Sequence, residues 1–593
     1  MLRSHTCGEL RPSDIGREVT LCGWIHRRRD HGGLIFLDLR DRYGYTQVVI
    51  HPEQKDIFAT AERVRSEWVL QIQGKVAKRA PGAERNDSPT GTLELIASNI
   101  AILNEAKTPP FAIDQEKDIN EEVRLQYRFL DLRRARLQQN IAVRHNMTRI
   151  IRSYFHRQNF LEIETPILVK GTPEGSREYL VPSRLYHGEF YVLPQSPQQL
   201  KQLLMVAGFD RYFQVARCFR DEDQRGDRQP EFTQFEIEMS FVDENDVMEV
   251  MEGCFLEVTE QLRPDKRIQK KPFPRMSYRE AMLKYGSDKP DLRYDLAFTD
   301  ITSLVQGCGF KVFADAADGG VVAALVAPGG AAFTRKDLDG LTDLALRHGG
   351  KGLAYILVKS DGLQSPILKY IGEDLCKKIL EHTGAKNGDA IFFAAGEFPS
   401  ALEPLGYVRK GIAERLKLID EFCWSYVWIV DFPMFEKSKE NGEVVSVHHP
   451  FTRPKAEDVN LLRSNPLAAR AVAYDLVLNG NEVGGGSVRI HERALQKHIF
   501  NILGISSVDA ERRFGHMLKA FEYGAPPHGG IAMGLDRLCM LFCNEPNIRE
   551  VIAFPKDQKA KDLMLGAPSP IPEAQVRELG IGILPEEGMV KGK

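Results

Sequence analysis

Residues 219–223 read Phe-Arg-Asp-Glu-Asp, and after a short polar loop residues 228–240 read Arg-Gln-Pro-Glu-Phe-Thr-Gln-Phe-Glu-Ile-Glu-Met-Ser. From Thr233 to Ser240 polar and apolar residues alternate strictly, which predicts a strand with one apolar and one polar face. We expect a long-looped antiparallel hairpin whose polar face lines a cleft. Arg220 would end the first strand, where its fixed fork of N–H donors could hold a phosphate and a carboxylate together. Taken alone, such a charged run is equally typical of a solvated loop.

Two later stretches carry related chemistry. Residues 529–537 read Gly-Gly-Ile-Ala-Met-Gly-Leu-Asp-Arg before an apolar helical run, so the glycines allow close backbone approach and Arg537 falls within the helix. Residues 475–484 read Asp-Leu-Val-Leu-Asn-Gly-Asn-Glu-Val-Gly, in which Asn-Gly predicts a two-residue type I′ hairpin. In that register Asp475 is a diagonal neighbour of Glu482, about 7–8 Å away at the backbone, and two such acids suit Mg²⁺ bound with nucleotide phosphates. A tight turn and two unrelated surface acids remain the alternatives.

Arg489 follows Glu482 by seven residues. A regular pleat would put these two side chains on opposite faces of the strand. A shared site therefore requires an irregularity, which we expect as a β-bulge within the glycine run 484–486.

The rest of the sequence divides into segments that differ in composition and in predicted secondary structure. Residues 1–105 contain five short strand-like runs and a helical segment at 57–65, typical of a small closed barrel such as an OB-fold. Residues 106–140, which include Thr108-Pro109-Pro110, read as a linker. The expected barrel strands are Val19–Trp24, Leu34–Leu39, Thr46–His51, Trp68–Val76 and Thr92–Ala97. The other expected segments are a first catalytic part at 141–287, a Gly- and Ala-rich inserted α+β domain at 288–420, a second catalytic part at 421–556 and a C-terminal extension at 557–593.

Composition narrows the class of protein. The chain has 593 residues, 43 % apolar and 27 % charged, and a formal net charge of −3, values ordinary for a soluble multi-domain protein. The sequence has no long apolar run and no apolar core of a signal peptide, so we expect a cytoplasmic protein. Its nine cysteines form no Cys-x-x-Cys pair, which favours free thiols over zinc or disulfides. The net charge is uninformative about nucleic acid, since phosphate contact needs only a local basic surface.

Together these stretches resemble the class II aminoacyl-tRNA synthetases. Residues 219–222 with the loop and strand are similar to motif 2 of that class, and residues 534–537 to its motif 3. Residues 160–166, Phe-Leu-Glu-Ile-Glu-Thr-Pro, resemble motif 1, whose proline marks the dimer interface. The resemblance implies a multi-domain α+β fold with an N-terminal OB-fold barrel, an antiparallel-sheet catalytic domain, an inserted α+β domain, and a homodimer.

Further stretches resemble the bacterial-type aspartate branch of this class, namely residues 172–175, 195–201, 448–452 and 484–489. The resemblance covers nearly the whole chain, including the insertion at 288–420. It implies that the α-carboxylate of L-aspartate attacks the α-phosphate of ATP, and that aspartyl-adenylate then passes its aspartyl group to the 3′ end of tRNA-Asp. Such chemistry needs positioning and charge stabilisation rather than a side-chain nucleophile.

The resemblance also implies roles for single residues. Arg489 would pair with the side-chain carboxylate of aspartate, with Lys201 and His448 adding positive field. Glu174, Gln198 and Glu236 would lie at the α-ammonium, although the family usually has aspartate where this chain has Glu236. Arg220 would bridge the α-phosphate and the attacking carboxylate and, with Arg537, would be catalytic. The ATP contacts would be Arg220, Asp221, Glu222, Gln229, Phe232, Glu482, Gly534, Leu535, Asp536 and Arg537. Asp475 and Glu482 would hold the Mg²⁺ cofactor.

Residues 24–47 suggest how the barrel meets tRNA. Arginines such as Arg28 can clamp phosphates, an exposed Phe36 can stack on an unpaired base, and Gln47 can hydrogen-bond a base edge. A basic barrel surface with a core phenylalanine is the alternative. His31 and Gly82 resemble the relaxed type of the family, which charges tRNA-Asn as well as tRNA-Asp with aspartate and needs a separate amidotransferase downstream.

Three alternatives stay open from the sequence. The chain could be a discriminating enzyme that charges tRNA-Asp only. It could be an asparaginyl- or lysyl-tRNA synthetase of the same subclass, although Lys201 with Arg489 favours an acidic substrate. It could also be a non-catalytic tRNA-binding paralogue, which should have lost residues for ATP or metal, whereas this chain keeps them.

Overall fold

The computed structural model describes residues 1–86, 88–113, 115, 119–171, 177–224, 226–438 and 441–584. The chain forms two compact units. The first comprises residues 1–145, 224–229 and 543–571, and the second comprises 146–223, 230–542 and 572–593. No helix in the described part of the chain is long and apolar enough to cross a membrane.

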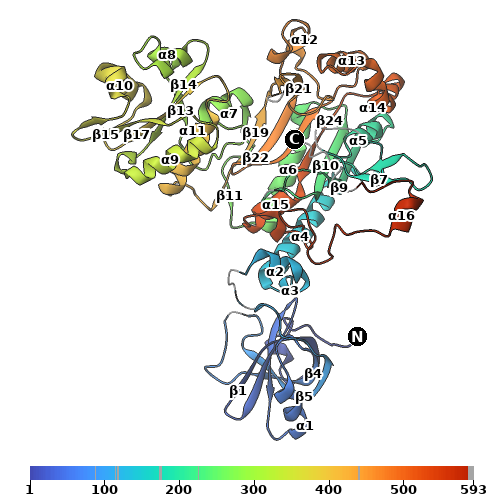
Figure 1. The fold of residues 1–593 in the computed structure, drawn as a ribbon. Coiled ribbons are helices and arrows are strands. Elements are labelled where there is room, and N and C mark those ends of the chain that lie inside the picture. Colours follow the sequence, from blue (N-terminus) through green and yellow to red (C-terminus); the bar gives the residue numbers. More distant parts are fainter. Residues whose placement is uncertain are drawn as a thin grey trace. The chain divides into compact units, whose positions relative to one another are not determined.

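The first unit contains a closed five-stranded barrel in the order β1-β2-β3-β5-β4, drawn in blue in Figure 1. Its strands are β1 (Glu18–His31), β2 (Leu34–Asp41), β3 (Gly44–Ile50), β4 (Val69–Lys78) and β5 (Leu93–Asn104). Alternating side chains fill the interior, and α1 (Lys55–Arg63) packs Ile57 and Phe58 against that core. The OB-fold predicted from strand spacing is confirmed.

The first unit also contains a buried cluster of ion pairs. It involves α2 (Glu121–Gln126), α3 (Arg128–Asp131), the start of α4 (Ala135–Arg157) and the segment that follows residue 543. Arg124 forms a two-pronged pair with Glu550 at 2.9 and 2.6 Å, and Arg128 bonds Asp131 at 2.7 Å. These contacts tie residues distant in sequence into one unit.

The second unit is built on an eight-stranded, mostly antiparallel sheet in the order β12-β19-β22-β23-β24-β10-β9-β6 (Figure 1). Its strands are β6 (Leu161–Glu162), β9 (Arg211–Phe219), β10 (Glu231–Ser240), β12 (Arg275–Ser277), β19 (Tyr426–Val430), β22 (Ala473–Leu478), β23 (Asn481–Val488) and β24 (His528–Gly534). Phe235 of β10 contacts Phe155 of α4 on the apolar face, with ring centroids 5.0 Å apart. The alternation predicted for 233–240 therefore divides the sheet into a packed face and a polar face.

The predicted hairpin between β22 and β23 is confirmed. Asn479 and Gly480 both have positive φ, 50° and 79°, as a type I′ turn requires, and Val477 pairs with Glu482. A bulge follows, because Leu476 pairs with Gly484 and leaves Val483 without a partner. The irregularity lies one residue before the expected glycine run, and it returns Gly485, Ser487 and Arg489 to the face that carries Glu482.

The insertion forms a five-stranded sheet in the order β13-β14-β17-β15-β16. Its strands are β13 (Phe298–Asp300), β14 (Val321–Ala327), β15 (Ala354–Lys359), β16 (Gly362–Gln364) and β17 (Ala390–Gly396), with helices α8 (Lys311–Ala317), α9 (Arg335–Arg347), α10 (Leu368–Thr383) and α11 (Glu403–Arg415). Two apolar clusters lie on the two faces of this sheet, one with Leu325 and one with Ala324. The α+β fold expected of the insertion is confirmed.

The other elements complete the second unit. They are the helices α5 (Gln198–Val206), α6 (Glu244–Leu262), α7 (Tyr278–Tyr285), α12 (Leu461–Ser464), α13 (Arg493–Ile502), α14 (Ser507–Ala520), α15 (Leu535–Cys543) and α16 (Glu573–Glu578), and the short strands β7 (Leu180–Pro182), β8 (Phe190–Val192), β11 (Arg267–Ile268), β18 (Cys423–Trp424), β20 (Phe435–Lys437) and β21 (Val444–Ser446).

Candidate functional site

Four buried charges of alternating sign lie on the polar face of the large sheet. Glu236 and Glu238 project from β10, Lys201 comes from α5 and Arg489 follows β23. Lys201 Nζ lies 3.1 Å from Glu236 Oε2 and 3.5 Å from Glu238 Oε2. All four side chains are at most 2 % exposed. Because burying charge is unfavourable unless each charge is paired, this alternation is what allows so many ions to lie inside the protein.

Arg489 is the most extensively bonded of the four. Its Nε and Nη2 donate to the two oxygens of Glu238 at 3.0 and 3.2 Å, and Nη2 also donates to the Gly530 carbonyl. Its Nη1 donates to Ser487 Oγ at 2.6 Å. Despite desolvation by burial, the largest influence, the fork of bonds holds the pKa of Glu238 below its usual value and raises that of Arg489.

His449 accepts a hydrogen bond from Arg489. Arg489 Nη1 lies 2.8 Å from His449 Nε2, and because a guanidinium only donates, Nε2 is the acceptor. Burial, with the Arg489 charge as a further cause, lowers the pKa of His449 well below its ordinary value, so the ring is neutral at neutral pH. The imidazole therefore helps to hold the guanidinium of Arg489 in place, and this buried cation is suited to a carboxylate.

His448 differs from its neighbour. Its ring packs against Phe432 with centroids 4.7 Å apart, and its Nε2 lies 3.5 Å from Asp475 Oδ1. Burial and the Arg489 charge lower the pKa of His448 to about 4. A ring with this pKa is uncharged at neutral pH, which does not support the prediction that His448 adds positive field.

Glu236 shows what the extra methylene does. Its Oε1 accepts from the hydroxyl of Tyr212 at 2.7 Å while Oε2 pairs with Lys201. The longer side chain thus spans two partners on neighbouring elements. Gln198, at the start of α5, is 7 % exposed and lies one helical turn before Gln202. Glu174 lies outside the described residues.

Arg220 follows the last residue of β9, as predicted. Its guanidinium lies 5.1 Å from the ring centroid of Phe232, and its buried Nε has no hydrogen-bond partner among the described residues. A buried donor without a partner is costly, so this atom is poised for an acceptor such as a phosphate oxygen. Asp221 lies beside it and is exposed, with its backbone N–H bonded to Arg177, and Glu222 is half-buried.

The residues predicted to contact ATP after β24 divide into two kinds. Arg537, in α15, donates from Nη1 to the Glu482 carbonyl at 2.6 Å. Asp536 is buried and accepts the backbone N–H of Thr233 at 2.8 Å, and Leu535 is a core residue next to Gly534. These two side chains anchor the turn that presents Arg537, and the ATP contacts predicted for Asp536 and Leu535 stay predictions.

Gln229 also has another role in this structure. Its Nε2 donates to the Lys556 carbonyl at 3.0 Å, and its Oε1 accepts the Lys556 N–H at 2.8 Å. Both ends of the amide are therefore used by the backbone of the first unit. The ATP contact predicted for Gln229 stays a prediction.

Asp475 and Glu482 meet the chemical requirement for a divalent cation. Burial and the nearby charge of Glu482 raise the pKa of Asp475 well above its usual value. Two carboxylates that repel each other suit a cation, and Mg²⁺ commonly uses two protein carboxylates with phosphate oxygens. The described residues contain no cluster of three or more metal-ligating side chains.

In the barrel, strand register decides which residues share a surface. Phe36 pairs with Arg29 and Val49, and Gln47 pairs with Asp38, so Arg29, Phe36 and Gln47 lie on one face. Arg29 Nη2 lies 3.3 Å from Gln47 Oε1. Arg28 pairs with the core residue Leu37 on the opposite face and donates to the Ala61 carbonyl. The structure therefore does not group Arg28 with the other two predicted contacts, and Arg29 takes that place.

The two residues associated with relaxed tRNA selection are both exposed. His31 ends β1, directly before the Gly32-Gly33 turn. Gly82 lies in the loop between β4 and β5 with φ of +86° and open space where a side chain would be. Its N–H donates to Glu84 at 2.7 Å. Neither position offers a built contact to a base.

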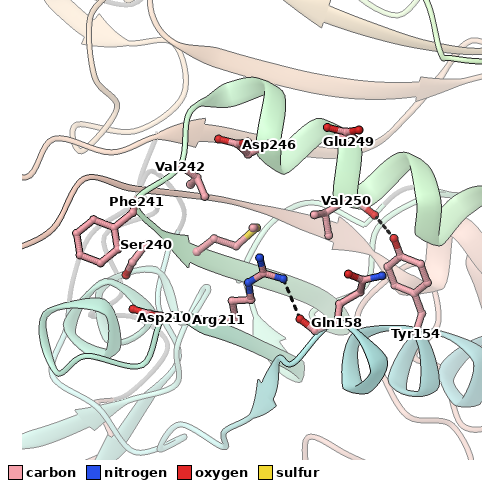
Figure 2. Close-up of a pocket in the computed structure, with 11 residues that line it drawn as sticks. Tyr154, Gln158, Asp210, Arg211, Ser240, Phe241, Val242, Asp246, Glu249 and Val250 are labelled. Atoms are coloured by element: carbon pink, nitrogen blue, oxygen red, sulfur yellow. Dashed lines mark hydrogen bonds between the residues drawn. The ribbon is translucent and has the colours of Figure 1, made fainter.

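A separate hollow of about 550 Å³ lies beside β10 (Figure 2), and Met239 of that strand is among its lining residues. Tyr154 and Gln158 of α4, Arg211 of β9 and Glu249 of α6 line it. Arg211 donates to the Gln158 carbonyl at 2.9 Å. None of the predicted site residues lines this hollow, so it is distinct from the charged site.

Comparison with known proteins agrees with this geometry. Residues 120–558 match the family described as tRNA synthetases class II (D, K and N), and residues 19–103 match the OB-fold nucleic acid binding domain. The chain belongs to the class II tRNA synthetases. As a member, it acts on an amino acid, ATP and tRNA.

Close relatives cover the whole chain. The Aspartate--tRNA(Asp/Asn) ligase of Rubrobacter xylanophilus is 51 % identical over 587 residues, 99 % of this chain and 98 % of that protein. The protein of the same name from Bacillus subtilis is 49 % identical, with 98 % of each chain covered.

Two solved synthetases share the fold. Asparaginyl-tRNA synthetase from Pyrococcus horikoshii, complexed with asparaginyl-adenylate, has a TM-score of 0.59 and 18 % identity over 94 % of this chain and 98 % of that one. Aspartyl tRNA synthetase from Entamoeba histolytica has a TM-score of 0.58 and 19 % identity over 93 % and 91 %.

Sequence reasoning missed several residues of the charged site. Glu238 was within reach, because strict alternation places it on the same face as Glu236. Tyr212, Gln202 and His528 gave no signal, since nothing in their local sequence indicates that they meet. They are brought together only by the pairing of β9, β10 and β24 and by the packing of α5.

Proposed function

We propose that this chain is an aspartate–tRNA ligase that activates L-aspartate with ATP and transfers it to tRNA-Asp and tRNA-Asn. Relatives that carry this name are about half identical to it over almost its full length. The 288–420 insertion, the linker at 106–140 and the catalytic parts at 141–287 and 421–556 would be the domains of such an enzyme, with anticodon binding by residues 1–105.

The observation that carries the proposal is the buried guanidinium of Arg489, which Glu238, Ser487 and His449 hold in place. A carboxylate can accept through both of its oxygens, whereas the amide of asparagine offers one oxygen and one NH₂ group. With the amide nitrogen turned to the guanidinium, asparagine would place N–H against N–H in a buried site. Lys201 adds a further positive charge close by. The geometry therefore favours an acidic side chain over its amide.

The ATP side of the site supports adenylate formation. The Nε of Arg220 has no partner among the described residues and would meet the α-phosphate and the attacking carboxylate, while Phe232 offers an aromatic face to the adenine. Arg537 would stabilise charge on the departing pyrophosphate. Positioned cations of this kind act most strongly where water is excluded.

Mg²⁺ is the implied cofactor, and Asp475 and Glu482 are the residues that would hold it. When bound, the ion would neutralise phosphate charge. Asp475 alone is a poor ligand while its carboxyl holds a proton. A cation that lowers its pKa would therefore bind with release of a proton.

Two partner proteins follow from the proposal. The resemblance of residues 160–166 to motif 1, with Pro166, supports a homodimer. If tRNA-Asn receives aspartate, an amidotransferase must convert the product before it can serve in translation.

Amino-acid-dependent ATP–pyrophosphate exchange tests the activation step. We expect exchange with L-aspartate and none above background with L-asparagine or L-lysine. Exchange with asparagine in preference to aspartate would favour the asparaginyl alternative. A lack of exchange with all three would favour a non-catalytic tRNA-binding protein.

A further inference from the structure

A buried series of hydrogen bonds begins at the side chain of Gln198. Gln198 Nε2 lies 3.0 Å from Gln202 Oε1, both on α5. Gln202 Nε2 lies 3.0 Å from His528 Nε2 at the start of β24, and His528 Nδ1 lies 2.8 Å from the Pro526 carbonyl. Gln202 and His528 are fully buried. Buried polar side chains are favourable only when every donor and acceptor has a hydrogen-bond partner, so the directions of these hydrogen bonds are constrained.

The direction of each bond follows from its fixed end. A carbonyl oxygen only accepts, so His528 must donate to Pro526 from Nδ1–H. Burial, the largest influence, lowers the pKa of His528 although Glu238 acts in the opposite direction, so the ring is neutral and its Nε2 accepts. The NH₂ group of Gln202 must then face His528, and its oxygen must face Gln198. The NH₂ group of Gln198 is thereby used in the bond to Gln202.

The consequence is a fixed orientation of the Gln198 amide. Within the described residues, its Oε1 accepts no hydrogen bond, and it is the only acceptor that the side chain can offer to a ligand. An α-ammonium group has three donors and no acceptor, so it requires that oxygen. If the amide turned over, its NH₂ group would face the ammonium and the bond to Gln202 would be lost as well.

We propose that Gln202 and His528 are positioning residues that hold the oxygen of Gln198 toward the α-ammonium of L-aspartate. The inference rests on the proposed function through the role given to Gln198. It adds two residues that touch no substrate, yet set the affinity for the amino acid. Their effect is confined to the ammonium end of the pocket, because the bonds of Arg489 and Lys201 do not involve Gln198, Gln202 or His528.

The test compares two ligands that differ in the ammonium group. L-Aspartate carries it, whereas succinate has the same two carboxylates without it and would compete for the same pocket. In Gln202→Met, which keeps the side-chain length and removes the hydrogen bonds, we expect the KM for aspartate in ATP–pyrophosphate exchange to rise about tenfold or more. The inhibition constant of succinate, the KM for ATP and kcat at saturating aspartate should stay near their wild-type values.

His528 provides a rescue experiment. His528→Leu should behave like Gln202→Met. His528→Gln, whose Oε1 can accept near the position of Nε2, should recover most of the affinity for aspartate. A purely structural role would make the two His528 variants similar, with losses for aspartate, ATP and succinate alike, and that outcome would overturn the inference.

Gln198→Leu separates the inference from the proposed function. We expect it to weaken aspartate but not succinate. If it does so while the Gln202 and His528 variants leave aspartate unaffected, the positioning role is wrong and the proposed function stands. If Gln198→Leu does not distinguish the two ligands, the ammonium role of Gln198 fails, and the inference fails with it.

Discussion

The charged pocket and the barrel surface are built in opposite ways. In the pocket, Arg489 and Lys201 are buried, and the bonds to Glu238 and Ser487 fix the guanidinium of Arg489 before any ligand arrives. In the barrel, His31 and Gly82 are exposed, and no atom lies within 4 Å of the place where a side chain on Gly82 would be. A preorganised buried site discriminates strongly between ligands, since an unmatched group there is left unpaired. An open surface imposes no such penalty. Under the proposed function, the enzyme is therefore strict toward its amino acid and relaxed toward the first base of the anticodon.

The largest effect should come from breaking the pocket at Arg489. Arg489→Lys keeps the charge but loses the fork that binds Glu238 and Ser487, and we expect aspartate-dependent exchange to fall by about a hundredfold or more. Arg489→Leu should also lower the unfolding midpoint, because it removes the guanidinium bonded to both oxygens of the buried Glu238 and leaves Lys201, 3.5 Å away, to balance that charge. Arg470→Leu, at a half-exposed arginine paired with Asp458, is the matched control and should change exchange little. Equal losses of aspartate-dependent exchange in the Arg489 and Arg470 variants would argue against a special role for Arg489.

The second-largest effect should come from acid, which should lower the stability of the fold around the pocket. His448 has a pKa of about 4 in the folded chain, below the ordinary value of 6.5. The unfolded chain therefore binds more protons between these values, and stability falls as pH drops from about 6.5 toward 4, by up to about 3 kcal/mol from this residue. Above pH 6.5 its contribution is fully present. Urea unfolding at several pH values measures the slope, and His448→Asn should reduce it, leaving the part that comes from His449 and His528, whose pKa values burial also lowers. An unchanged slope in that variant would place the acid sensitivity elsewhere.

Shortening Glu236 should have a smaller effect. An aspartate here could not reach both Tyr212 and Lys201, so one buried bond would be lost, and we expect the KM for L-aspartate to rise by about tenfold. Tyr212→Phe removes only one of the two contacts and should cost less. The two KM values are obtained from ATP–pyrophosphate exchange. If Glu236→Asp binds aspartate better than wild type, the extra methylene is a defect that the pocket tolerates.

The smallest effect should come from giving the barrel a side chain at Gly82. Asparagine is among the residues that tolerate positive φ, and the space around Gly82 is open, so Gly82→Asn should fold normally. A polar side chain there could contact one anticodon better than the other, and we expect the ratio of tRNA-Asn to tRNA-Asp charging to change by less than about tenfold. ATP–pyrophosphate exchange, measured in parallel, should be unchanged. A parallel loss of exchange would show that the substitution acts through folding instead.

The contrast between the two regions also explains what the sequence could predict. Periodicity placed the polar face of β10 and the Asn-Gly hairpin correctly, because these patterns depend on local backbone geometry. The bulge was expected at the right hairpin but one residue too late, at glycines 484–486 instead of Val483. At this hairpin, the requirement that Glu482 and Arg489 share a face predicted the bulge better than the local sequence did.

Other residues were out of reach for the same physical reason. A register shift between Ile25 and Arg27 decides that Arg29, not Arg28, joins Gln47, and nothing in the sequence indicates that shift. Gln229 and Asp536 carry the polar groups expected of ATP ligands, yet both bond to backbone groups distant in sequence. A residue type predicts what a side chain can bind, whereas only the packed chain decides which partner it meets.

The most direct test is a charging experiment with two amino acids and two tRNAs. Labelled L-aspartate and L-asparagine are each offered to the enzyme with purified tRNA-Asp and tRNA-Asn transcripts. We expect aspartate on both tRNAs at comparable rates and asparagine on neither. Aspartate on tRNA-Asp alone would contradict the relaxed barrel, and asparagine on either tRNA would contradict the strict pocket.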